Sequence, residues 1–370
     1  MRAAIARRGE IVVDDLPTPE PGPGEVLVRT RYCGICGSDL HALHHGRRLA
    51  PLMRKAGSFF TADPDLDLVP GHEFCAEVVD YGPGTTGQIP AGSLVCSEPA
   101  LFTPAGLEPI GFSNDVPGGY GQYMTLMEGL LVPVPNGLPA EHAALTEPMA
   151  VGVHAVAKAE LPPGAAVLVV GCGPVGLAVI GALKLAGAEQ IIAADFSPKR
   201  RSLAEAMGAD AVVDPAMMSP YERFQDLAQV DPARAAPRPI WRGGPSLRPQ
   251  VIFECVGVPG VLASVLEGAE PGARVVVVGV CMEQDHFEPI YAINKEIEVR
   301  FVFGHSPDEF AATLRHIAEG DLPVEDLITA KVGLDGVAGA FEALADPEEH
   351  AKILIDPWAD DSADDSEESS

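Results

Sequence analysis

The sequence predicts an α/β protein with a doubly wound parallel sheet inserted in a second, mainly antiparallel β domain. In the middle of the chain, residues 151–290, apolar strand-like runs alternate with helix-like segments, the pattern of a parallel sheet. Before it, residues 1–150 carry short β-like runs separated by glycine- and proline-rich turns. After it, residues 291–357 end in a strand-like run at Lys352–Ile355, so we expect the two ends to fold together.

The most informative stretch of the central region runs from Val167 to Asp195. It opens with an apolar run typical of a strand buried on both faces. Gly171, Gly173 and Gly176 follow in the G-x-G-x-x-G spacing, ahead of a helix-compatible segment and a second apolar run that ends at Asp195. Because strand, helix, strand and acid follow in order, we interpret the motif as a Rossmann-type dinucleotide site rather than a glycine-rich turn without a ligand.

Each position of this motif has a mechanical role. The first glycine permits a tight turn, the second lets a pyrophosphate approach the backbone, and the third lets the helix pack close to the strand. Pro174 and Val175 are expected to contact the cofactor. The helix-compatible segment runs from Val175 to Ala186, and the free N–H groups at its start attract phosphate. A carboxylate at Asp195 accepts hydrogen bonds from the adenosine ribose and repels a 2′-phosphate, which favours NAD over NADP.

Length and composition limit the class of protein. A chain of 370 residues is long enough for two domains with their own cores. It shows no apolar run long enough for a membrane span and no signal-peptide pattern, so we expect a soluble cytoplasmic protein without a membrane partner. The net charge of −28 argues against nucleic acid as a partner. Seven scattered cysteines indicate free thiols, and the acidic tail 358–370 is expected to be disordered.

Two segments show no clear periodicity. Residues 47–70 are expected to form an extended surface loop that lines or covers the substrate cleft. Residues 215–250 read as a helix followed by an irregular loop.

Four residues carry metal-ligand chemistry: Cys36, His72, Glu73 and Glu147. A thiolate, an imidazole and a carboxylate together suit zinc, although each residue alone also has an ordinary structural explanation. Cys33 and Cys36 form a lone C-x-x-C, but neither a thioredoxin-like context nor the second C-x-x-C of a zinc ribbon accompanies it. His44 and His45 are interpreted as loop residues near the mouth of the cleft.

Several motifs in order support one family. CGICGSDLH, GHE, TEP, GCGPVG and KILIDP together resemble the zinc-containing medium-chain alcohol dehydrogenase family, over nearly the whole chain. The polyol, secondary-alcohol and threonine dehydrogenase branch is the most similar. The resemblance implies a Rossmann domain inserted in a GroES-like catalytic domain, NAD as cofactor, a small alcohol or ketone as substrate, and a homodimer or homotetramer.

The resemblance also implies roles for individual residues. Cys36 and His72 are implied as zinc ligands, and Glu73 and Glu147 compete for the third ligand position. Ser38, His41 and Glu73 are implied to be catalytic: the Ser38 hydroxyl bonds the substrate alcohol, and His41 ends the proton relay.

Two further residues take supporting roles by the same resemblance. Asp39 is implied to orient the histidine ligand, and Lys352 to lie near the cofactor phosphates. Many relatives bind a structural zinc with four cysteines in the stretch that corresponds to 97–121. This stretch holds none here, so we expect one catalytic zinc per chain and no structural zinc.

The reaction implied is hydride transfer between NAD and a secondary alcohol, vicinal diol or polyol, with zinc lowering the pKa of the bound alcohol. Three alternatives stay open at this point. They are a zinc dehydrogenase specific for primary alcohols or aldehydes, a zinc-free NADP-dependent quinone or enone reductase, and a non-catalytic binding protein on the same fold.

Overall fold

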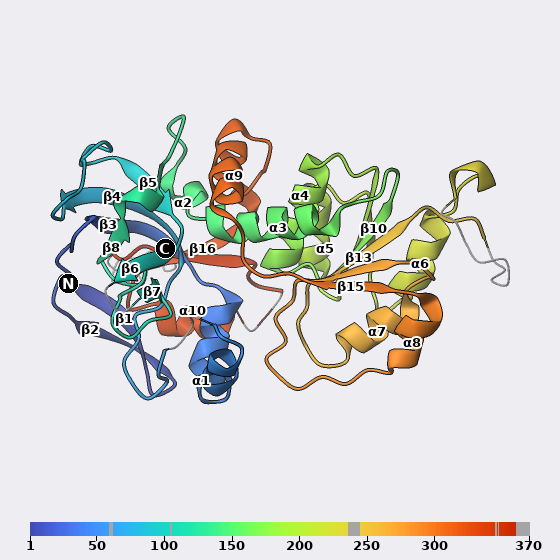
Figure 1. The fold of residues 1–370 in the computed structure, drawn as a ribbon, viewed down its shortest axis with the longest axis horizontal. Helices are drawn as coiled ribbons and strands as arrows, with labels where there is room; N and C mark the ends of the chain where they lie inside the picture. Colours follow the sequence, from blue (N-terminus) through green and yellow to red (C-terminus); the bar gives the residue numbers. More distant parts are fainter. Residues whose placement is uncertain (59–61, 104–105, 236–244, 345, 347, 360–370) are drawn as a thin grey trace, which may run out of the picture. The chain divides into compact units, whose positions relative to one another are not determined.

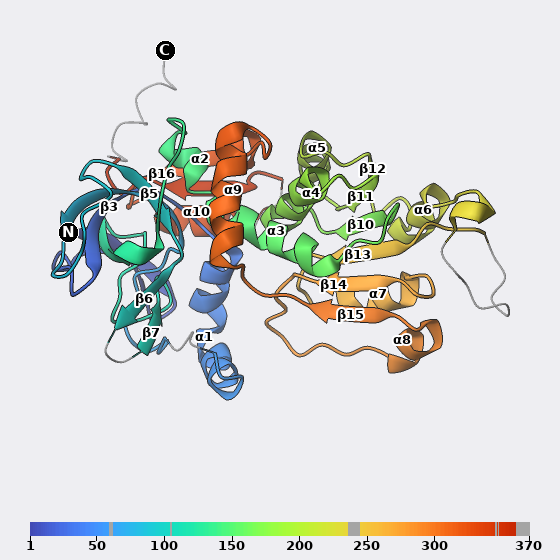
Figure 2. The same ribbon diagram turned by 45° about the horizontal axis from the view of Figure 1, so that its top comes forward.

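A computed structural model describes residues 1–58, 62–103, 106–235, 245–344, 346 and 348–359. The chain divides into two compact units. The first unit contains residues 1–147, 310–320 and 324–370, and the second contains residues 148–309 and 321–323. Each unit has its own sheet (Figures 1 and 2).

The second unit is built on a six-stranded parallel sheet of order β12-β11-β10-β13-β14-β15. From one edge to the other, its strands are β12 (Ala211–Val213), β11 (Gln190–Ala194), β10 (Ala166–Val170), β13 (Gln250–Glu254), β14 (Arg274–Val277) and β15 (Glu298–Phe301). Strand β10 lies near the centre, which explains its apolar sequence AVLVV. The expected parallel, doubly wound sheet is confirmed.

Helices cover both faces of this sheet. On one face, α4 (Pro174–Leu185) and α5 (Pro198–Ala206) follow β10 and β11 (Figure 1). On the other, α6 (Pro220–Leu227), α7 (Val261–Gly268) and α8 (Pro289–Lys295) enclose an apolar cluster that includes Leu168, Ile192 and Ile252. The unit also contains α3 (Thr146–Ala159), whose first two residues belong to the first unit, and η2 (Pro232–Arg234).

The sheet continues beyond the expected boundary at residue 290. Strand β15 pairs in parallel with β14, with Val275 opposite Val299, and therefore belongs to the second unit, which extends to Glu309. The alternating apolar and charged residues of 297–303 are compatible with an edge strand of either sheet, so the sequence does not show which domain this strand joins.

The first unit is built on a seven-stranded, mainly antiparallel sheet. Its strand order is β16-β17-β3-β4-β5-β9, and β8 also pairs with β3. The strands are β16 (Ile328–Val332), β17 (Lys352–Ile355), β3 (Glu25–Gly34), β4 (Glu73–Tyr81), β5 (Leu94–Ser97), β9 (Leu131–Pro133) and β8 (Tyr123–Met127). Strand β17 pairs with β3, which confirms that the C-terminal strand completes the N-terminal sheet.

Short hairpins and helices complete this unit. The hairpins are β1 (Arg2–Arg7) with β2 (Glu10–Asp15), and β6 (Ala100–Thr103) with β7 (Gly106–Pro109). The helices are α1 (Gly37–Lys55), η1 (Glu128–Leu130), α2 (Ala140–Ala143), α9 (Pro307–Glu319, mostly in this unit), η3 (Glu325–Leu327) and α10 (Val337–Ala343).

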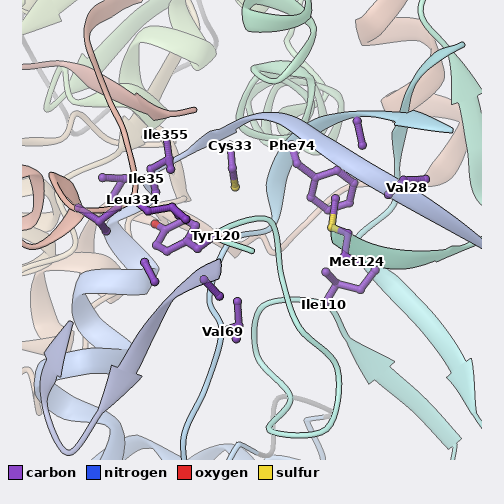
Figure 3. Close-up of a cluster of buried hydrophobic side chains, with 14 of the residues drawn as sticks. Val28, Cys33, Ile35, Val69, Phe74, Ile110, Tyr120, Met124, Leu334 and Ile355 are labelled. Atoms are coloured by element: carbon purple, nitrogen blue, oxygen red, sulfur yellow. The ribbon is translucent and has the colours of Figure 1, made fainter. Parts of the chain in front are cut away.

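An apolar cluster of buried side chains packs beneath the β3–β4 pair. Figure 3 shows Phe74 and Met124 at one end of the cluster, and Tyr120 beside Ile35 at the other. Tyr120 is fully buried, so its ring contributes to the core while its hydroxyl needs a polar partner.

Two expectations for this unit need correction. The segment 47–70 is not wholly an extended loop, because α1 continues to Lys55 through Pro51. Its Leu, Ala, Arg and Met residues favour helix, and Leu40 and Leu43 anchor the helix on the core. The chain also stays ordered beyond residue 357, where the Trp358 indole N–H donates to the Thr30 carbonyl at 2.9 Å.

The rest of the expected disordered tail, 360–370, lies outside the described residues, as do 236–244 of the expected irregular loop. Among the residues that the structure describes, no helix combines the length and apolar character needed to cross a bilayer.

Candidate active site

Three of the expected metal ligands lie together in the first unit. One ligand atom each from Cys36, His72 and Glu73 lies within 4.8 Å of the other two. Cys36 immediately precedes α1, whereas His72 and Glu73 stand at the start of β4. The pairing of Gly34 with Glu73 on adjacent strands brings these distant segments to one point.

Two glycines make this arrangement sterically possible. Gly71 has a φ of +104°, and a Cβ there would lie 2.5 Å from the Tyr120 ring. A Cβ at Gly34 would lie 2.2 Å from a carboxylate oxygen of Glu73. A side chain at Gly34 would displace the Glu73 carboxylate and one at Gly71 would displace the Tyr120 ring, so the glycines of CGICG and GHE are needed for packing.

Asp39 is buried at the centre of a hydrogen-bond network. Its Oδ2 accepts from the Cys36 backbone N–H at 3.0 Å and from the Tyr120 hydroxyl at 2.8 Å. Its Oδ1 lies 3.4 Å from His72 Nδ1, and neither atom has a hydrogen-bond partner in the described part of the chain. Asp39 therefore faces Nδ1 and leaves Nε2 of His72 for a metal.

Tyr120 was not identified by the sequence analysis. The GGY sequence gives no sign that its hydroxyl reaches Asp39, which is 81 residues away.

The surroundings of His72 favour a positive charge. Burial lowers the pKa of this imidazole, but the negative charge of Asp39 and contacts with Asp39 and Cys36 outweigh it, so its pKa is raised well above the usual value. The Phe112 ring lies 4.9 Å from the His72 ring and limits contact with solvent. A site that stabilises an imidazolium also attracts a metal cation.

Lys352 lies with the metal candidates. Its buried ammonium donates to both carboxylate oxygens of Glu73, at 2.7 and 2.9 Å, and to the Ile35 carbonyl at 3.0 Å. Burial lowers its pKa, but the charges of Glu73, Cys36 and Glu147 raise it further, so the net pKa is above the usual value. Lys352 thus neutralises Glu73 in this structure.

Glu147 does not belong to the group of three. It stands in the first turn of α3, and its charge raises the pKa of Lys352. The charges of both Glu73 and Glu147 therefore act on Lys352. These contacts do not show which of the two glutamates is the third metal ligand.

The donor set fits zinc. A thiol sulfur, an imidazole nitrogen and a carboxylate oxygen in one buried group are the ligands of a catalytic zinc with a position left for substrate. The buried Nδ1 beside Asp39 supplies the carboxylate–histidine contact that usually supports such a ligand. Cys33 is a poor redox partner for Cys36, because burial raises the pKa of its thiol well above the usual value.

Ser38 and His41 lie on the first two turns of α1, directly after Cys36. A spacing of three residues places both on one side of the helix. Burial, followed by the charges of His45 and His44, lowers the pKa of His41 below its usual value. The imidazole is thus kept neutral near pH 7, the form that can accept a proton.

The expected nucleotide motif has the required backbone in the second unit. Gly173 is the N-cap of α4, Pro174 its first residue, and Val175 its second. A Cβ at Gly171 would lie 2.6 Å from Val256, and a Cβ at Gly176 would lie 1.9 Å from the Gly171 carbonyl oxygen. The turn therefore excludes side chains where a phosphate approaches the backbone.

Asp195 follows β11 and is held by backbone donors. Its two carboxylate oxygens accept from the N–H groups of Cys172 at 2.7 Å and Ser197 at 2.8 Å. These bonds fix the carboxylate next to the glycine turn. The remaining lone pairs of both oxygens are the acceptors that a ribose would use.

Comparison with known proteins agrees with this geometry. Residues 22–136 match the family model of the alcohol dehydrogenase GroES-like domain, and residues 174–319 match that of the zinc-binding dehydrogenase. The chain is 33% identical over 357 residues to (R,R)-butanediol dehydrogenase of Bacillus subtilis, covering 94% of this chain and 97% of that protein. It is 28% identical to sorbitol dehydrogenase of Gallus gallus, covering 92% of each.

A solved structure agrees as well. A zinc-binding dehydrogenase structure from Sinorhizobium meliloti, bound to NADP, superimposes with a TM-score of 0.76 at 28% identity, covering 96% of this chain and 99% of that one. The chain therefore belongs to the zinc-containing medium-chain alcohol dehydrogenase family, in the branch that includes butanediol and sorbitol dehydrogenases.

Proposed function

We propose that this protein oxidises a secondary alcohol, vicinal diol or polyol with NAD, and reduces the matching ketone in reverse. The observation that carries this proposal is the grouping of Cys36, His72 and Glu73 within 4.8 Å, next to Ser38 and His41. The butanediol and sorbitol dehydrogenases among the relatives support this class of substrate.

Cys36, His72 and one carboxylate would hold the metal. When bound, zinc would supply a Lewis acid at the substrate oxygen and NAD would supply a hydride acceptor. The Ser38 hydroxyl binds the substrate hydroxyl and takes up its proton, and His41 accepts that proton at the outer end of the relay. Asp39 and Tyr120 hold the His72 ring in place.

The charge of Lys352 bears on how Glu73 could serve as the third ligand. Because Lys352 donates to both carboxylate oxygens of Glu73, a metal that recruits Glu73 must first displace this ammonium. We propose a single catalytic zinc per chain, with Glu73 and Glu147 as alternative ligands.

Asp195 supports NAD rather than NADP as the cofactor. Its carboxylate is fixed by two backbone bonds beside the glycine turn, where a 2′-phosphate would meet a negative charge. The Asp195→Ser variant is expected to lower kcat/KM for NAD and raise it for NADP. Equal use of both cofactors by the natural protein would argue against this assignment. The family resemblance implies that Lys352 lies near the cofactor phosphates, and in this structure its ammonium donates to Glu73.

We further propose a cytoplasmic homodimer or homotetramer. Support comes from β15, at the edge of the parallel sheet, where the Phe301 side chain is 74% exposed. Ile290, Ile293 and Phe303, close to β15 in the sequence, are also exposed. Exposed apolar side chains and a strand edge that pairs with no further described strand are features of an interface between chains. Sedimentation of the purified protein gives the assembly state directly.

The activity is tested with zinc-loaded protein, NAD and a panel of butanediols, polyols, primary alcohols and enones. Turnover of secondary alcohols or diols that is lost on chelation and in Cys36→Ser supports the proposal. Preference for primary alcohols, zinc-independent enone reduction with NADPH, or no turnover of any substrate by fully loaded protein would each overturn it.

A further inference from the structure

Helix α1 carries His41, which the proposed reaction uses, and His45, which it does not use. His41 and His45 are four residues apart, and their ring centroids lie 6.0 Å apart. Residues at this spacing lie one above the other on a helix surface. Leu40 and Leu43 face the core, whereas His45 is exposed and His41 half-buried, so both rings are open to ions from solvent.

The ring geometry is close to that of a chelate. Two imidazoles on one tetrahedral ion, with metal–nitrogen bonds of about 2.1 Å, have ring centroids about 5 Å apart. Side-chain rotation that brings the rings about 1 Å closer than their 6.0 Å separation is enough to reach this arrangement. The rings are tilted by 39° rather than stacked, which leaves their nitrogens accessible.

The nitrogens of both rings are available. Within the described residues, neither His41 nor His45 has a hydrogen bond to another side chain or to the backbone. The lowered pKa of His41 keeps its lone pair unprotonated near neutral pH, the form that binds a metal. Imidazole pairs prefer Cu²⁺, Ni²⁺ and Zn²⁺ to Mg²⁺ or Ca²⁺, which take oxygen ligands.

We propose that His41 and His45 form a second metal site, for a divalent transition-metal ion, separate from the Cys36 centre. Water completes the coordination, and the ion binds through one nitrogen of each ring. Because the ion takes the lone pair that His41 would use for a proton, its binding inhibits alcohol oxidation. This inhibition rests on the proposed function, whereas the binding itself does not.

Arg48 adds a positive charge to the same helix as the histidine pair. It is exposed and stands three residues after His45, on the same side of α1. Its positive charge opposes a divalent cation through solvent, so Arg48→Ala is expected to tighten binding about two- to threefold at low salt.

The test uses untagged, zinc-loaded protein and Ni²⁺ as the probe. Calorimetric titration is expected to show one Ni²⁺ bound per chain, with retention on an immobilised Ni²⁺ column. His45→Ala is expected to lose both signals and to keep the basal activity. The matched control His44→Ala, one residue away, is expected to keep them.

The possible outcomes test metal binding by the histidine pair and inhibition of alcohol oxidation separately. Absence of Ni²⁺ binding, or binding that survives His45→Ala, overturns the site. Inhibition of the natural enzyme by Ni²⁺ that disappears in His45→Ala supports the whole proposal, and binding without inhibition overturns only the role of His41. Inactive protein that still binds Ni²⁺ through His45 supports the site and contradicts the proposed function.

Discussion

Replacing Lys352 by methionine tests whether the buried ion pair with Glu73 shapes the metal centre. The Lys352 side chain is 4% exposed and that of Glu73 is 1% exposed. Methionine keeps the length and apolar stem of the lysine but removes three hydrogen bonds, two to Glu73 and one to Ile35. The variant therefore leaves a carboxylate buried without its counter-charge.

The expected cost is large. Unit charges about 3 Å apart at an effective dielectric constant of 20 attract by about 5 kcal/mol. Loss of one partner of a buried pair typically costs about 3–5 kcal/mol, because the other charge stays buried and unpaired. We therefore expect metal-free Lys352→Met to lose about 3–5 kcal/mol in the free energy of unfolding.

Urea denaturation of metal-free and zinc-loaded protein measures this difference. Zinc is expected to restore part of the lost stability, because Glu73 can then ligate the ion. The control is Lys352→Met combined with Glu73→Gln, which removes both charges and is expected to recover most of the loss. A loss below about 1 kcal/mol in the single variant would refute the reasoning, because a carboxylate buried without a counter-charge lowers the free energy of unfolding by more than that.

Three further predictions concern other contacts. Tyr120→Phe removes a donor to Asp39 and is expected to weaken zinc binding about 10- to 100-fold in a competition titration; an unchanged affinity would show that the hydroxyl does not support His72. Gly176→Ala puts a Cβ 1.9 Å from the Gly171 carbonyl oxygen and is expected to cost about 1–3 kcal/mol and weaken NAD binding, measured by fluorescence quenching. The control Gly339→Ala, in α10, puts a Cβ into open space and should leave NAD binding unchanged. Burial raises the pKa of Glu309, but bonds from Ser306 and His154 outweigh burial and leave this pKa below its usual value. The ionised carboxylate therefore stabilises the fold above pH 4.5, and this contribution is lost as the pH falls through the lowered pKa. Glu309→Gln should flatten the dependence of Tm on pH in that range, and an unaltered profile would contradict the assignment.

Much of the fold follows from local patterns in the sequence. Strand β10, helix α4 and strand β11 lie within a residue of their expected bounds, because a fully buried strand and a glycine turn have strong local signals. Strand β17 matches its expected bounds, Lys352–Ile355.

Other features depend on tertiary contacts. Helix α1 passes through Pro51, and β15 is recognisable only by its pairing with β14. Within the site, Cys36, His72 and Glu73 could be selected by motif. The hydrogen bonds of Tyr120 to Asp39 and of Lys352 to Glu73 join residues 81 and 279 positions apart, for which the sequence holds no local signal.

The most direct test of the account is the zinc content per chain of the natural protein and of Cys36→Ser, measured by elemental analysis after removal of loosely bound metal. The account predicts about one zinc in the natural protein and almost none in the variant, because Cys36 supplies the thiolate of a single centre. Zinc content that is unaffected by the substitution, or two tightly held zinc ions per chain, would contradict it.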